Sequence, residues 1–294
     1  MKVKELKMSD WFNPKTKQKF EKDLYQGLRE CGFIVLKEHS VNTSILGEAY
    51  SLSKDFFESD EDHKKQFISK VNEFQRGYTP YKVEKAKDAK AIDLKEFYQI
   101  GQDDNIFPDD KFKDTFLNLY KELASCSENI LKALAPSIGL ESNYFEPMVE
   151  KGNHVLRLLH YPPIGENESE DAIRAAEHED INLITLLVAA EGKGLQLKDN
   201  FGNWIDIETE KGDIVVDTGD MMSRITNNHL PATTHRVVNG NQTDKSRYSM
   251  PFFCHPNEKA MLKVIEHFKD GNEQKDILAN DFLNERLKEI GLKK

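Results

Sequence analysis

The sequence EHEDINLITLL, residues 177–187, joins a polar pair to a short apolar run. The run has the length of a β-strand, and His178 and Asp180 stand two residues apart just before it. Side chains at positions i and i+2 of an extended chain point to the same face. An imidazole and a carboxylate can therefore converge here, either as metal ligands or as a hydrogen-bonded pair without a metal.

The chain on both sides of this stretch has the pattern of a β-rich domain. From about residue 152, short apolar runs alternate with Gly, Asn and Asp, and they read HVLRLLHY, NLITLLVAA, GLQLK, NWIDI, GDIVVDT, TTHRVVN and RYSMPFFC. Runs of four to eight residues with such turn punctuation are typical of a sandwich or barrel. The sequence thus predicts an α+β protein with a mainly β core.

Helical segments precede and follow the β region. Apolar residues recur with helical spacing at residues 16–30, 44–59 and 111–139, and a strand is expected at 31–38. After Pro256 the chain is expected to be helical again and to end in FLNERLKEIGL, residues 282–292. The expected parts are an N-terminal mixed α/β region (1–135), a β core (152–258) and a C-terminal helical extension (259–294).

Composition and charge argue against several functional classes of protein. The 294 residues carry a formal net charge of −10, which argues against binding to nucleic acid or to an anionic membrane surface. The three cysteines are widely spaced and fit neither a disulfide framework nor a zinc finger. No apolar segment resembles a signal peptide or a membrane span. We expect a cytoplasmic protein, monomeric by default, that acts on a small molecule.

A third metal ligand is available further along the chain. His235 lies in TTHRVVN, on another expected strand. Two histidines and one carboxylate can form a facial triad that leaves the opposite side of the metal open. That arrangement suits Fe(II), which must also bind O₂ and a co-substrate. The candidate metal ligands, and thus the candidate catalytic residues, are His178, Asp180 and His235.

The motif RYS, Arg247 to Ser249, follows His235 and suggests an anion site. An arginine can bind a carboxylate through two hydrogen bonds, and a serine two residues on faces the same way along a strand. This pair could hold the far carboxylate of a dicarboxylate whose other end chelates the metal. Tyr161, in LLHYPP, could supply a further hydroxyl group.

These motifs together resemble the isopenicillin N synthase-like family of Fe(II)/2-oxoglutarate-dependent oxygenases. The resemblance rests on HxD, the distal histidine and RxS at this spacing. It also rests on HYPP, HEDINLITLL, GLQLKDNFGNWIDI, GDIVVDTGDMMSRITNN, HRVVN and RYSMPFF, and on the N-terminal GFIVLKEH and RGYTP. It covers roughly residues 10–290. HxD alone would be a weak signal, whereas the set is specific.

The resemblance implies a fold, a set of cofactors and a reaction. The fold would be a double-stranded β-helix (jelly roll) with flanking helices. His178, Asp180 and His235 would bind Fe(II), and Arg247 and Ser249, with Tyr161, would hold 2-oxoglutarate. With O₂ as oxidant, 2-oxoglutarate would be converted to succinate and CO₂ while an unactivated C–H bond of a small molecule is hydroxylated, desaturated or cyclised.

Two departures keep alternatives open. Many plant members carry an asparagine where this chain has Leu159, two residues before Tyr161. Isopenicillin N synthase and the amino-cyclopropane oxidase keep RxS yet do not use 2-oxoglutarate. An Fe(II)/O₂ oxidase of the same fold is thus one alternative, and a catalytically silent binding protein is another. A zinc hydrolase would favour HExxH, which is lacking here.

The sequence gives only weak indications of which residues contact the substrate. Arg76, Tyr78 and Phe252 are candidate substrate contacts, although aromatic residues in such segments often pack onto the barrel instead. His160 alternates to the strand face opposite Tyr161, and no catalytic role is expected for it. No motif names the substrate.

Overall fold

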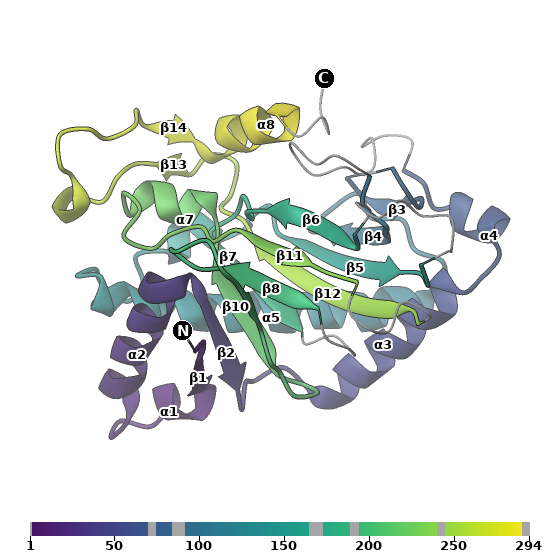
Figure 1. Ribbon diagram of the computed structural model, residues 1–294, viewed down its shortest axis with the longest axis horizontal. Coiled ribbons are helices and arrows are strands. Elements are labelled where there is room, and N and C mark those ends of the chain that lie inside the picture. Colours follow the sequence, from purple (N-terminus) through teal and green to yellow (C-terminus); the bar gives the residue numbers. More distant parts are fainter. Residues whose placement is uncertain are drawn as a thin grey trace.

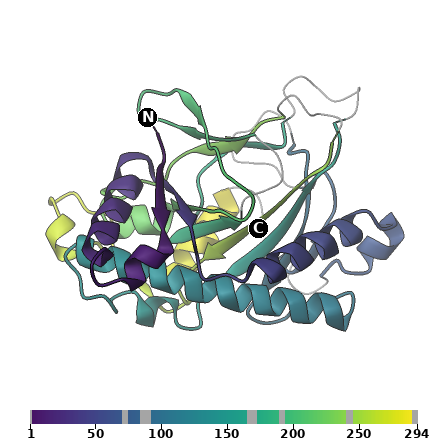
Figure 2. The ribbon, with the colours of Figure 1, turned by 90° about the horizontal axis from the view of Figure 1, so that it is seen from below.

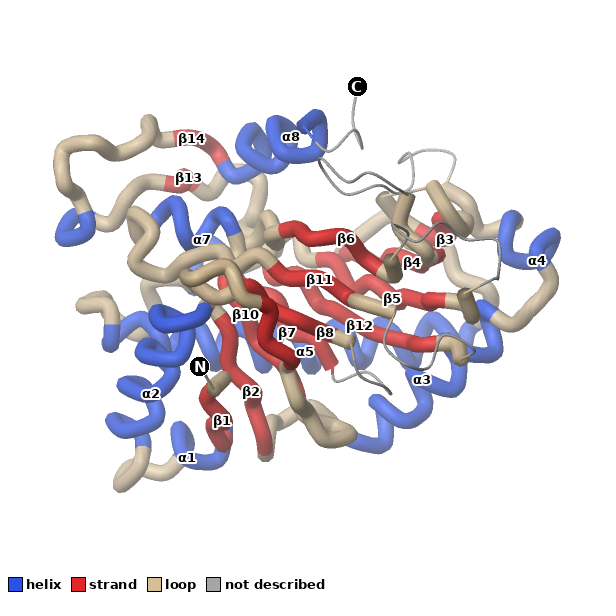
Figure 3. The backbone as a smooth tube through the Cα atoms, viewed as in Figure 1, coloured by secondary structure: helices blue, strands red, loops and turns tan. Residues whose placement is uncertain are grey.

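The computed structural model describes residues 2–69, 75–83, 92–164, 173–188, 194–239 and 245–289. It has three layers: long helices cover one face of a large sheet, and a smaller sheet lies over the opposite face (Figures 1 and 2). Figure 3 shows that the strands gather in the centre and most helices lie at the periphery. No helix in the described ranges is long and apolar enough to cross a membrane.

The larger sheet draws its strands from both halves of the chain. Its order is β1-β2-β10-β7-β12-β5-β4-β3. The strands are β1 (Lys4–Lys7), β2 (Phe33–Lys37), β3 (Gly77–Thr79), β4 (Glu96–Gly101), β5 (Val155–Tyr161), β7 (Ile184–Val188), β10 (Ile214–Thr218) and β12 (Arg247–Cys254). The N-terminal region therefore extends the same sheet at both edges.

The smaller sheet contains four strands in the order β6-β11-β8-β9. They are β6 (Ala175–His178), β8 (Leu195–Lys198), β9 (Trp204–Asp206) and β11 (His235–Val237). β6 and β11 are antiparallel, and their register sets His178 directly opposite His235. The two histidines, far apart in the chain, are thus brought together by strand pairing.

Three amphipathic helices cover the outer face of the larger sheet, namely α2 (Lys17–Cys31), α3 (Thr43–Phe57) and α5 (Asp110–Ser137). The predicted face of α2 is buried, and α5 ends just before Gly139, which has a left-handed backbone conformation at φ 72°. Shorter helices are α1 (Met8–Phe12), α4 (Glu61–Lys65), α6 (Glu146–Val149) and α7 (Asp220–Ile225).

Two apolar clusters hold the layers together. The larger one joins the helices to the outer face of the large sheet and includes Phe116, Leu123 and Leu186. The smaller one lies between the two sheets and includes Phe33, Leu197 and Val215. A jelly-roll core with flanking helices, as the sequence predicts, is confirmed.

The chain after Pro256 differs in part from the helical prediction. It forms a two-stranded sheet, β13 (Met261–Leu262) with β14 (Ile277–Leu278), and a 3-10 turn (Glu266–Phe268) before the helix α8 (Ala279–Glu289). The segment between the two strands includes Gly271 and is too polar to give a helix a continuous apolar face. Only the final segment has that face, with Ala279 and Phe282 buried.

Candidate active site

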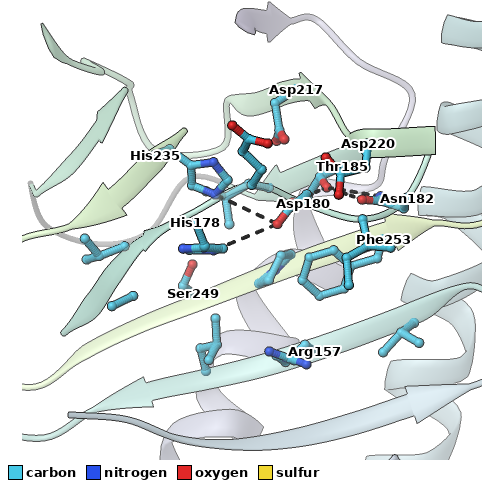
Figure 4. A pocket seen from close by; sticks show the side chains of 18 of the residues that line it. Arg157, His178, Asp180, Asn182, Thr185, Asp217, Asp220, His235, Ser249 and Phe253 are labelled. Carbon is cyan, nitrogen blue, oxygen red and sulfur yellow. Dashed lines mark hydrogen bonds and ion pairs between the residues drawn. The ribbon is translucent and has the colours of Figure 1, made fainter. Parts of the chain in front are cut away.

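A cavity of about 550 Å³ opens between the two sheets, and its size suits a small molecule. Both sheets contribute to its walls, and side chains of α8 line it as well. Figure 4 shows side chains from several strands converging on this space. The sequence-predicted residues that line it are His178, Asp180, His235, Arg247, Ser249, Tyr161 and Arg76.

The three predicted metal ligands meet at one point of this cavity. Asp180 Oδ1 lies 3.9 Å from His178 Nε2 and 3.9 Å from His235 Nε2. One ligand atom from each residue falls within 4.8 Å of the others. These separations suit three donor atoms around one small cation. In Figure 4 both imidazoles point towards the same carboxylate oxygen.

Hydrogen bonds set the tautomer of both imidazoles. Nδ1 of His178 is 2.8 Å from the carbonyl oxygen of Ala176, and Nδ1 of His235 is 3.1 Å from that of Thr233. A carbonyl can only accept, so each Nδ1 carries the hydrogen and donates it. Each Nε2 is left with a lone pair that faces the other ligands. A metal-binding histidine needs this arrangement.

The carboxylate is fixed in a similar way. The Thr185 hydroxyl donates to Asp180 Oδ2, and the Asn182 side chain donates to the Thr185 oxygen at 3.1 Å and to the Ile184 carbonyl at 2.6 Å. Gly219 packs against the backbone here, and a Cβ at that position would lie 2.4 Å from the Asn182 carbonyl. Asp180 lies just beyond the end of β6, where no strand pairing fixes the backbone. These hydrogen bonds orient its side chain instead.

The surroundings of the triad favour the protonation states in which its side chains can bind a metal near neutral pH. Burial, together with the neighbouring His235, lowers the pKa of His178 to about 4, so its imidazole is neutral. Burial and the charge of Asp180 raise the pKa of Asp217 well above its usual range. Asp217 also lines the cavity, and this shift favours the neutral form of its carboxyl group.

A buried guanidinium lies in the same cavity. Arg247 is 3% exposed, and its Nε and Nη1 have no hydrogen-bond partner among the described residues. Register places it opposite Tyr161, whose ring centroid is 5.2 Å from the guanidinium carbon. Ser249, two residues further on β12, also faces the cavity. Buried donors without partners are costly, so this site is suited to an anionic ligand.

Comparison with known proteins agrees with this geometry. Residues 152–256 match the 2OG-Fe(II) oxygenase superfamily, and residues 4–122 match the family of N-terminal regions of non-haem dioxygenases in morphine synthesis. A crystal structure described as a 2OG-Fe(II) oxygenase family protein, from Caulobacter crescentus, is 36% identical, with 98% of this chain and 99% of that chain covered and a TM-score of 0.88. This chain belongs to the 2OG-Fe(II) oxygenase superfamily.

Other relatives of the oxygenase extend the comparison. A 2-oxoglutarate-Fe(II) type oxidoreductase from Aspergillus fumigatus is 28% identical over 85% of this chain and 81% of its own length. The crystal structure of a full-length Neurospora crassa protein, in complex with alpha-KG and thymine, is 27% identical, covers 97% of this chain and 96% of that chain, and has a TM-score of 0.88. The resemblance inferred from the sequence is therefore confirmed. The protein is an Fe(II)- and 2-oxoglutarate-dependent enzyme.

Two residues that the sequence predicts as substrate contacts of the oxygenase, Tyr78 and Phe252, lie outside the cavity. Tyr78 is fully buried in the helix-side core, and its hydroxyl donates to Glu96. Phe252 is also fully buried there and packs against Tyr120 at 5.3 Å between ring centroids. Neither residue lines the cavity. Along β12, Arg247 and Ser249 face the cavity, so strand alternation turns Phe252 away and Phe253 inward.

Several residues that line the cavity of the oxygenase were not predicted from the sequence. The same alternation along β5 turns Arg157 and Leu159 towards the cavity with Tyr161, so Leu159 is an apolar neighbour of the Arg247 pocket. His160 faces the other way, and its Nδ1 lies 2.7 Å from Glu96 Oε1. Further lining residues outside the prediction are Gln99, Thr185, Asp217, Phe253 and His255.

Proposed function

We propose that this oxygenase oxidises an unactivated C–H bond of a small-molecule substrate, by hydroxylation, desaturation or cyclisation, and converts 2-oxoglutarate to succinate and CO₂. The observation that carries the proposal is the convergence of three ligand atoms in one cavity with a buried guanidinium that has two nitrogens without a partner among the described residues. The superfamily assignment supports the same chemistry. Its curated relatives include a protein named as a proline hydroxylase, 27% identical over 93% of both chains.

In this proposal His178, Asp180 and His235 hold Fe(II). The donor set fits, because two neutral imidazoles and one carboxylate leave coordination positions for other molecules. Bound iron would supply the activation of O₂ and a chelation site for the keto acid. The protein keeps both Nε2 lone pairs available and keeps Asp180 oriented through Thr185.

Arg247 holds the far carboxylate of 2-oxoglutarate in this proposal, with help from Ser249 and Tyr161. The guanidinium gains a partner for two buried donors, and the pairing fixes the direction of the co-substrate. The apolar cluster between the sheets surrounds this pocket and excludes water from the charge pair. The oxidase alternative can keep the same Arg and Ser pair, so the preference for 2-oxoglutarate rests on the relatives named as 2-oxoglutarate-Fe(II) type oxidoreductases.

Isotope labelling tests the reaction type. Purified protein with Fe(II), ascorbate and 2-oxoglutarate under ¹⁸O₂ should release succinate that carries one ¹⁸O atom, because one oxygen of O₂ enters the keto acid as CO₂ leaves. Arg247→Met should lose this product at low 2-oxoglutarate concentration. Unlabelled succinate, or none from the wild type, would refute the proposal.

A further inference from the structure

The three candidate metal ligands lie on segments that differ in their support. His235 lies on β11, which pairs with both β6 and β8, and the Thr185 hydroxyl orients Asp180. His178 lies at the end of β6, an outer strand of the smaller sheet that has β11 as its one neighbour among the described strands (Figure 1). An edge strand presents N–H and C=O groups that no second strand satisfies. The backbone that leads to His178 therefore depends on contacts from outside its sheet.

The short segment Asp93–Lys95, which precedes β4, makes such contacts. Asp93 Oδ1 accepts a hydrogen bond from the N–H of Ala176 on β6 at 3.0 Å. The N–H of Leu94 donates to the carbonyl oxygen of Ile173, just before β6, at 3.1 Å. One backbone group of β6 and one of the segment that leads into it thus find their partners in the N-terminal region of the chain.

A single residue connects this contact to the metal ligand. Ala176 donates its N–H to Asp93, and its carbonyl oxygen accepts the hydrogen bond from Nδ1 of His178 at 2.8 Å. The second of these bonds sets the tautomer and the direction of the imidazole. A shift of Ala176 would therefore turn the ring of His178 and move its Nε2 away from the other two ligand atoms. Asp93 is thus two hydrogen bonds away from the imidazole.

The Asp93 carboxylate is itself held in place. It lines the cavity but is only 2% exposed, and its Oδ2 lies 2.8 Å from Nζ of Lys95, which is also buried. Both carboxylate oxygens therefore have a partner within the protein. A buried carboxylate is costly unless it is paired and hydrogen-bonded, and these contacts offset that cost. Asp93 has the surroundings of a supporting residue rather than of a group that binds substrate.

We propose that Asp93 is a positioning residue for Fe(II) binding: through Ala176 it anchors the edge strand β6 and so holds the imidazole of His178 in the orientation that the metal requires. This inference rests on the proposed function, because it assumes that the triad binds Fe(II). Lys95 balances the charge of the carboxylate and takes no part in the hydrogen bond to Ala176. What the metal site requires at residue 93 is therefore the hydrogen-bond acceptor, and the ion pair is not required.

Two double variants that differ only in this acceptor test the inference. Asp93→Asn/Lys95→Met removes the ion pair and keeps an oxygen for the Ala176 N–H, whereas Asp93→Leu/Lys95→Met has a side chain of similar size without an acceptor. Anaerobic calorimetry without 2-oxoglutarate gives the Kd of Fe(II) for each. We expect the variant with leucine to bind Fe(II) roughly tenfold or more weakly than the variant with asparagine, as loss of a hydrogen bond behind a metal ligand would give. Equal Kd values would overturn the inference.

A core variant controls for a general loss of stability. Leu123 is fully buried on α5, in the apolar cluster on the helix side of the larger sheet. Leu123→Ala should lower the Tm and leave the Kd of Fe(II) unchanged. If it weakened Fe(II) binding as much as the leucine variant does, at an equal fall in Tm, the effect at Asp93 would be one of stability, and the inference would be wrong. Should the leucine variant not fold, Asp93→Val/Lys95→Met takes its place, with the same expected and contrary results.

The wild type and His178→Ala separate this inference from the proposed function. If the wild type binds Fe(II) and His178→Ala does not, the metal site is present, and the comparison of the two double variants tests Asp93 alone. No Fe(II) binding by the wild type, or unchanged binding by His178→Ala, would refute the proposed function and, with it, the inference.

Discussion

Replacing Arg247 by Met removes the guanidinium and keeps an unbranched, largely apolar stem. Arg247 is 3% exposed and has two buried nitrogens without partners among the described residues, so the charge pair with 2-oxoglutarate would be shielded from water. Truncating one partner of such a pair costs about 2–5 kcal/mol, or roughly a 30- to 4,000-fold rise in Kd. The Kd of 2-oxoglutarate, measured by anaerobic calorimetry with Fe(II), should rise by an amount in this range.

The same substitution weakens ligand binding but should not lower the thermal stability of the protein without ligand. An unpaired buried charge destabilises the fold, so Arg247→Met should unfold at the same or a higher temperature than the wild type. A concentration of 2-oxoglutarate that saturates the wild type should raise the Tm of the wild type more than that of the variant. Arg236→Met serves as the control, because Arg236 lies on β11 outside the cavity and donates to Gln196 Oε1 at 2.9 Å. A change in Kd below about threefold, which is within the error of such comparisons, would refute the reasoning.

Three further predictions concern neighbouring residues. Thr185→Val removes the hydroxyl that orients Asp180 and should weaken Fe(II) affinity by roughly 10- to 100-fold in a metal titration; unchanged affinity would contradict this role. Phe252→Ala should cost about 3–5 kcal/mol of unfolding free energy, whereas Phe253→Ala should cost much less, and urea titrations that rank them in reverse would contradict the assignment of the two faces. Burial lowers the pKa of His154 to about 4 from 6.5, so the unfolded state binds more protons between these values and stability falls as the pH drops from 6.5 to 4; His154→Phe should flatten that decline in urea titrations, and an unchanged slope would contradict the cause.

Much of the candidate metal site could be predicted from the sequence, because two of its three residues follow a local spacing pattern. His178 and Asp180 are two residues apart, and Arg247 and Ser249 repeat that spacing on β12. Strand alternation by itself places such pairs on one face. His235 needed the family pattern, since nothing local shows that β11 pairs with β6 in the register that brings the histidines together.

Other parts of the site depend on contacts between distant segments. Tyr78 is buried because β3 pairs with β4 and packs against α3, where Phe56 lies 5.8 Å from its ring centroid. No spacing rule in the sequence indicates that packing. Phe253, in contrast, could have been predicted, because the alternation that turns Ser249 inward also turns residue 253 inward. The hydrogen bond from Thr185 to Asp180 could not be predicted, because it depends on the folded turn that connects these two residues.

Titration of the Fe(II)-loaded protein with 2-oxoglutarate in the absence of O₂ tests the central claim most directly. Chelation at a site formed by His178, Asp180 and His235 should produce a weak visible charge-transfer band in the wild type. His178→Ala should abolish the band, and Arg236→Met should keep it with the same midpoint. A wild type that gives no band, or a His178→Ala variant that keeps it, would contradict the assignment of the metal site.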